Sequence, residues 1–177
     1  TVSDDPLERE VQRIYDATGE NVLPERAPKS FTHNKQEVNL TAEQYTEYAT
    51  TRGNELYDLM QKVVQSSTYK GASDSEKAEM LADAKTYADK KAKAEMGYRD
   101  GDSWATKADN AGIDPAAYIQ YMLVTDGLTA DKDANGKTIS GSKKEKVMAK
   151  INAMNITNAQ KDALYLIEGY SENTISD

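Results

Sequence analysis

The stretch LTAEQYTEYATTRGNELYDLMQKVVQSS, residues 40–67, decides the fold of this chain. Thr41 and Gln44 have the spacing of a capping box, in which each side chain bonds a backbone amide of the first helical turn. Gly53 interrupts the pattern at a cost of about 1 kcal/mol of helix stability relative to Ala. We interpret a glycine at this position as a site of close helix packing or of a slight bend. The stretch is predicted to be one long helix because its apolar residues recur mostly three or four positions apart, on one helical face: Tyr45, Tyr48, Ala49, Leu56, Met60, Val63 and Val64.

The segment before this stretch divides into a helix and a hairpin. Residues 4–17 have helical periodicity, with Pro6 in the first turn and Gly19 at the end. Residues 19–40 have none, but KSFT and EVNL, joined by HNKQ, predict a short two-stranded hairpin. The only histidine, His33, falls in the predicted turn, where a solvated side chain is the preferred interpretation over a catalytic or metal-binding one.

The segment after the long helix is predicted to be helical throughout. Ser73 and Glu76 form a second capping box before a helix at 74–96, which should return antiparallel along the first long helix. Four shorter helices follow, begun by Asp102 or Ser103, by Asp114-Pro115, by Ser142 with Glu145, and by Thr157 with Gln160.

The expected fold is therefore all-α, with a long antiparallel helical hairpin and a small β-hairpin. Residues 1–97 are predicted to hold the first helix, the β-hairpin and the helical hairpin. Residues 98–170 are expected to form an EF-hand-like subdomain of short helices, and residues 171–177 a tail or linker.

Composition narrows the classes of function. The net charge is −8, so we do not expect the phosphate backbone of a nucleic acid as a general partner. The chain has no cysteine, which excludes thiol nucleophiles and zinc thiolate sites, and no apolar run long enough to span a membrane. Its acidic start lacks Met and a signal-peptide pattern and reads as a cut piece of something longer. The eleven tyrosines suggest a core whose rings are buried while their hydroxyls stay in water.

One stretch resembles a metal site. Residues 131–142, DKDANGKTISGS, begin like a calcium loop, with candidate ligands Asp131, Asp133, Asn135 and the backbone carbonyl of Lys137. The loop then departs from the pattern, because position eight is Thr138 and position twelve is Ser142, which leaves no bidentate carboxylate. A degenerate, metal-free helix–loop–helix is the preferred interpretation; weak calcium binding and an unrelated Asp/Asn/Gly turn are the alternatives.

No catalytic motif is present in the sequence. It contains no Gly-rich phosphate loop, no HExxH, no GxSxG and no Cys/His pair. We therefore predict no enzymatic activity, no catalytic residue and no cofactor, with calcium bound only under the alternative interpretation of residues 131–142.

Four segments carry a resemblance to a known group of proteins: residues 8–31, 38–53, 131–154 and 160–177. They are similar to parts of very large proteins encoded by tailed phages and prophages of gut Firmicutes, described as minor structural, tape-measure-like or large polyvalent proteins. The resemblance covers nearly the whole chain but implies no catalytic residue. Relatives tend to have Asp-Gly or Asn-Gly in the hairpin turn, where this chain has Asn34-Lys35, and some have a more complete calcium-type loop.

The resemblance implies a non-enzymatic phage structural or internal virion protein that acts through contacts with other virion proteins or with itself. It would reside in the virion or in the host cytoplasm during infection. The alternative is a phage-encoded acidic protein that inhibits a host nuclease or defence complex by mimicking DNA. The −8 charge permits this alternative, but acidic residues are spread evenly along the chain, which weakens it.

Overall fold

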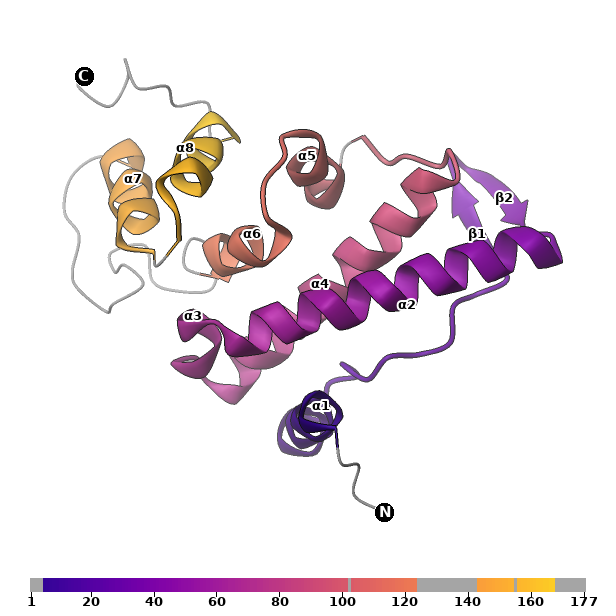
Figure 1. Ribbon diagram of the computed structural model, residues 1–177, viewed down its shortest axis with the longest axis horizontal. Helices are drawn as coiled ribbons and strands as arrows, with labels where there is room; N and C mark the ends of the chain where they lie inside the picture. Colours follow the sequence, from indigo (N-terminus) through magenta and orange to yellow (C-terminus); the bar gives the residue numbers. More distant parts are fainter. Residues whose placement is uncertain (1–4, 102, 124–142, 155, 168–177) are drawn as a thin grey trace.

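A computed structural model describes residues 5–101, 103–123, 143–154 and 156–167. The chain is mostly helical and has one small β-hairpin, as the sequence predicted (Figure 1). In chain order the described elements are α1 (Pro6–Thr18), β1 (Ser30–His33), β2 (Gln36–Asn39), α2 (Ala42–Gln65), α3 (Ser67–Lys70), α4 (Asp74–Glu95), α5 (Trp104–Asn110), α6 (Pro115–Met122), α7 (Lys143–Ala153) and α8 (Asn158–Ile167).

Helix α2 begins as the sequence predicted and ends earlier. The Thr41 hydroxyl accepts from the amide of Gln44 at 3.1 Å, and the Gln44 side chain accepts from the amide of Thr41 at 2.9 Å. The predicted helix to residue 67 instead stops at Gln65, because Ser66 takes an extended conformation. The Ser66 hydroxyl then accepts from the amide of Tyr69 and starts the short helix α3.

Helix α4 returns beside α2, and the two form the centre of the molecule (Figure 1). Its capping box is complete, with Ser73 and Glu76 bonding each other's backbone amides at 3.2 and 3.0 Å. Helix α4 also contacts α1, α5 and α6. The largest core cluster therefore draws buried side chains from α1 through to the end of α6, among them Ile14, Met60, Leu81, Ala105, Ile119 and Leu123.

The β-hairpin forms with the predicted strands, one residue shifted at the turn. Its register pairs Ser30 with Asn39 and His33 with Gln36, so the turn consists of Asn34 and Lys35, both with positive φ. The interpretation of His33 as a turn residue is wrong, because it is the last residue of β1. Its ring lies 5.4 Å from that of Tyr98 and is only partly exposed, since the hairpin leans on the chain beyond α4.

Helices α5 to α8 surround a second core cluster, which includes Tyr118, Ile151 and Leu164. Thr157 caps α8 by accepting from the amide of Gln160 at 3.2 Å, as predicted. The Gln160 side chain does not complete a capping box there; it accepts from the amide of Asp114 at 2.9 Å and joins α8 to the start of α6. The boundary at 97/98 and the EF-hand-like character of this part stay predictions.

Candidate protein-binding groove

The predicted calcium ligands Asp131, Asp133, Asn135 and Lys137 lie outside the described residues, so calcium binding stays a prediction. Within the described ranges, no three His, Cys, Asp or Glu side chains are placed to hold a metal ion. No helix among those described is long and apolar enough to cross a bilayer.

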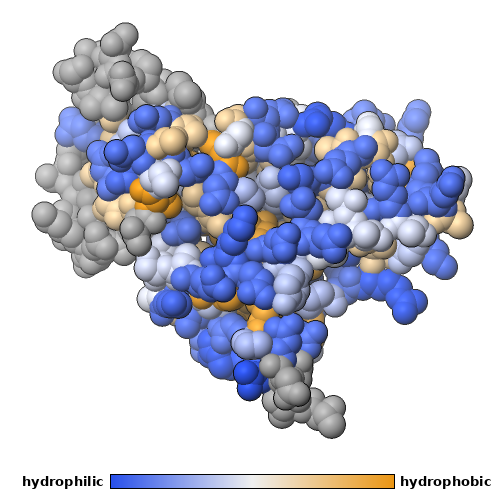
Figure 2. All heavy atoms as spheres, in the orientation of Figure 1, coloured by the Kyte–Doolittle hydropathy of each residue, from blue (hydrophilic) through white to orange (hydrophobic). Residues whose placement is uncertain are grey.

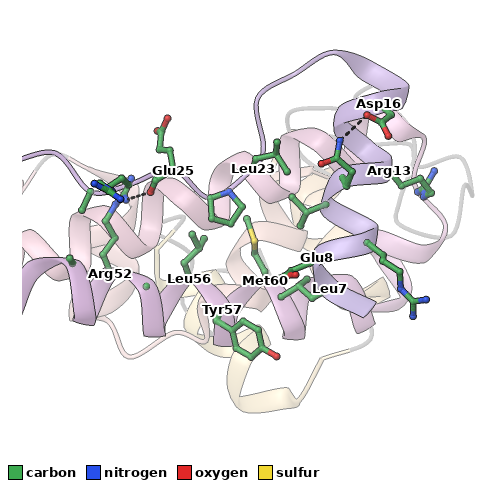
Figure 3. Close-up of a pocket in the computed structure, with 18 of the residues that line it drawn as sticks. Leu7, Glu8, Arg13, Asp16, Leu23, Glu25, Arg52, Leu56, Tyr57 and Met60 are labelled. Atoms are coloured by element: carbon green, nitrogen blue, oxygen red, sulfur yellow. Dashed lines mark hydrogen bonds between the residues drawn. The ribbon is translucent and has the colours of Figure 1, made fainter. Parts of the chain in front are cut away.

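A groove of about 1070 Å³ lies between α1, residues 23–27 and α2 (Figure 3). Along α2, Arg52, Leu56 and Met60 follow one another at its base, and Leu23 lies across from them. The space-filling view shows hydrophobic atoms at the seam between α1 and the long helices, within a mostly hydrophilic face (Figure 2).

The first wall of the groove is α1. Asp5 caps this helix by accepting from the amide of Leu7 at 2.9 Å, and Gly19 ends it with φ of 73°. Its apolar face, including Val11 and Ile14, is buried. Helix α1 packs more extensively on α4 than on α2. Space is therefore left open beside α2.

The second wall is the segment at residues 23–27, which Pro24 and Pro28 keep out of helical conformation. Side chains of α2 hold its backbone in place. The Tyr45 hydroxyl donates to the carbonyl of Ala27 at 2.8 Å, and the Arg52 guanidinium donates to the carbonyl of Glu25 at 3.0 Å. The wall is thus fixed by hydrogen bonds from α2 side chains to its backbone carbonyls and does not depend on secondary structure of its own.

Arg52 is itself held by the partly buried carboxylate of Asp89. Its Nε lies 3.3 Å from an oxygen of Asp89, and the other Asp89 oxygen lies 2.8 Å from Nζ of Lys93. The Tyr48 hydroxyl also donates to Asp89. Burial raises the pKa of the Tyr48 phenol above its ordinary value, and the hydrogen bond to Asp89 raises it further. This network orients Arg52 toward the second wall.

Apolar and aromatic groups line the interior of the groove. Leu7, Leu56 and Met60 are almost fully buried at its base, whereas the Tyr57 side chain at its edge is 48% exposed. Gly53 also lines the groove, and a Cβ added there would meet no atom within 4 Å. The interpretation of Gly53 as a site of close helix packing is therefore wrong; its lack of a side chain leaves the groove open.

The arginines at the edge of the groove differ in whether their side chains are paired within the protein. Arg13 bonds Glu10 at 2.9 Å and Asp74 at 3.2 Å, so its guanidinium is committed within the protein. Arg9 on α1 and Arg26 on the second wall are exposed, and their side chains have no ion pair or hydrogen bond with any described residue. Two guanidinium groups are therefore available on different walls.

A second, smaller cavity of about 240 Å³ lies between β1 and the chain beyond α4. Its cations are already engaged: Lys90 pairs with Asp100 at 2.9 Å, Lys93 with Asp89, and Arg99 donates to Asn110 at 2.7 Å. This cavity does not present free charge to a ligand.

No protein-family model, curated protein or solved structure matches the chain. The groove was missed by reasoning from the sequence, because it depends on which helix α1 packs against. A weak signal was present in the exposed Tyr57, which lies next to the buried stripe of α2, and in Arg26 between two prolines.

Proposed function

We propose that this chain is a non-catalytic module of a tailed-phage structural or internal virion protein, and that it binds another virion protein in the groove between α1 and α2. The phage context rests on the resemblance of the quoted segments. The protein-binding role is supported by one observation, an apolar groove of about 1070 Å³ with a half-exposed tyrosine at its edge. Tyrosine and arginine are enriched among the residues that contribute most to protein interfaces.

The chemistry of the groove supports binding over catalysis. Leu56 and Met60 at its base offer no general acid or base and no activated nucleophile, and Arg52 beside them is committed to Asp89 and the carbonyl of Glu25. Every buried side-chain nitrogen or oxygen in the described part of the chain has a hydrogen-bond partner. The polar network of Arg52, Tyr48 and Asp89 is therefore satisfied within the protein, and its Arg52 side chain holds the second wall in position.

Mass spectrometry of purified virions tests the proposed location. Phage particles from a strain whose prophage encodes this chain should contain peptides of the parent polypeptide at constant abundance relative to the tail proteins. The matched sample is the lysate fraction that remains after the particles are removed. Enrichment in the particles supports the proposal, whereas peptides confined to the particle-free fraction contradict it.

A further inference from the structure

We propose that the segment bound in the groove is acidic and amphipathic: its apolar side chains contact the groove interior and its carboxylates pair with Arg9 and Arg26. This inference rests on the proposed function and specifies the partner's chemistry.

The balance of basic and acidic residues in the groove lining differs from that of the chain as a whole. The residues that line it include four arginines and three carboxylates, whereas the full chain has 22 basic and 30 acidic residues. Because Arg13 and Arg52 are already paired with carboxylates, the groove presents two unpaired guanidinium groups, those of Arg9 and Arg26, on an acidic protein. Such a site favours an anionic partner and raises its rate of association.

The carboxylates of the lining are better satisfied than the two free arginines. Asp16 accepts from Gln12 at 2.8 Å, Glu25 lies 3.7 Å from Nζ of Lys85, and Glu8 is also engaged. Arg9 and Arg26 have no such partner in the described structure. Guanidinium groups bind carboxylates in a planar, two-point geometry, so these two residues suit acidic side chains on either flank of a bound segment.

The apolar interior decides between a protein and a nucleic acid. Leu56, Met60 and Leu23 offer contacts to aliphatic side chains and would leave a phosphate backbone without partners. A net charge of −8 further disfavours a polyanion. It also disfavours a second copy of this chain, since each copy carries the same charge.

Three designed helical peptides test the proposal by fluorescence anisotropy with the full chain. All have leucines at i, i+3, i+4 and i+7 and differ in their flanking residues, which are Glu, Gln or Lys. The Glu peptide should bind about tenfold more tightly than the Gln peptide, with the Lys peptide weakest, and the difference should shrink at high salt.

Two sets of variants locate the binding. Arg9→Gln with Arg26→Gln should reduce the affinity of the Glu peptide to near that of the Gln peptide, whose affinity should not change. Lys62→Gln with Lys107→Gln is the matched control: it removes the same charge at exposed positions outside the groove and should leave the preference intact. Gly53→Trp should fill the groove and abolish binding of the Glu and Gln peptides, whereas Gly53→Ala should retain it.

Several outcomes would overturn the inference: no measurable binding, equal affinity for the Glu and Lys peptides, or unchanged binding to the Gly53→Trp variant. Dimers seen by analytical ultracentrifugation and dissociated by Gly53→Trp would show a second copy as the occupant and would also overturn it. None of these results bears on whether the parent protein is in the virion, so the two proposals can fail separately.

Discussion

At the scale of single residues, Asp89 is the group on which the groove wall depends. Its carboxylate binds Arg52 and Lys93 and accepts from Tyr48, and Arg52 in turn donates to the backbone of Glu25. Its side chain is 22% exposed, so these interactions are only partly screened by water. The network was not predicted, because residues far apart in the sequence meet only when α2 and α4 pack.

Replacing Arg52 with Met tests this network. The variant leaves the carbonyl of Glu25 without its donor and Asp89 with one cation fewer, so the free energy of unfolding should fall by about 2–3 kcal/mol in urea titrations. The control is Arg13→Met, since Arg13 also makes two acidic contacts but its side chain is 47% exposed. The control should lose less than about 1 kcal/mol. Equal losses would contradict the assigned role.

The composition predicted the surroundings of the tyrosine rings but not those of the tyrosine hydroxyls. Their rings are buried, as expected, at Tyr48, Tyr69 and Tyr87. Their hydroxyls also form hydrogen bonds within the protein, which the composition did not predict. Each donates to a carboxylate: Tyr69 to Glu10 at 2.5 Å, Tyr87 to Asp109 at 3.4 Å, and Tyr48 to Asp89. Burial raises the pKa of all three phenols above the ordinary value of 10.

These raised pKa values predict a loss of stability in alkali. Above pH 10 the unfolded tyrosines release protons while the folded ones stay protonated, so the unfolding free energy falls as pH rises. Each such residue adds about 1.4 kcal/mol per pH unit to that slope. Urea titrations at a series of pH values above 10 should therefore give a shallower slope for Tyr69→Phe than for the wild type. Parallel curves would contradict burial of the Tyr69 hydroxyl.

At the scale of elements, the helix starts were the most predictable features. The capping boxes of Thr41 with Gln44 and Ser73 with Glu76 both form, because a capping box involves four consecutive residues and little else. Of the capping box predicted at Thr157, only one half forms. The Thr157 hydroxyl caps the helix, but the Gln160 side chain accepts a hydrogen bond from the amide of Asp114. The helix end at Gln65 was missed because Ser66 served as a cap for the next helix.

The hairpin turn offers a stabilising substitution. Lys35 has φ of 66°, a left-handed conformation that disfavours residues with a Cβ. Lys35→Gly should raise the free energy of unfolding by about 0.5–1 kcal/mol, since the relief of strain exceeds the added flexibility of the unfolded chain. Lys29→Gly, where φ is not positive, should give no gain. A loss of stability in Lys35→Gly would contradict the turn geometry.

At the scale of the whole molecule, the fold class could be predicted but the groove could not. Periodicity and caps specify helices, and they do not specify that α1 packs mainly on α4. Periodicity and caps also did not show that residues before and after residue 97 share one core. Ala105 and Ile119, both beyond residue 97, belong to the cluster that also contains Ile14 and Met60.

The shared core predicts cooperative unfolding. Trp104 is stacked on Tyr118 at 5.4 Å and packs against both core clusters, so its fluorescence reports on the second half and on the junction. Its urea midpoint should coincide with that of far-UV circular dichroism, which α2 and α4 dominate. Ile119→Ala should lower both midpoints together. Two separate midpoints would show that the halves unfold independently.

The central claim is that the groove contacts another protein inside the phage particle, and site-specific crosslinking in purified virions tests it most directly. A photoreactive phenylalanine at position 57, on the groove edge, should crosslink to an acidic amphipathic segment of one other virion protein, identified by mass spectrometry. The same group at position 107, outside the groove, should not. Equal crosslinking from both positions, or none from position 57 in particles that contain the parent protein, would contradict the account.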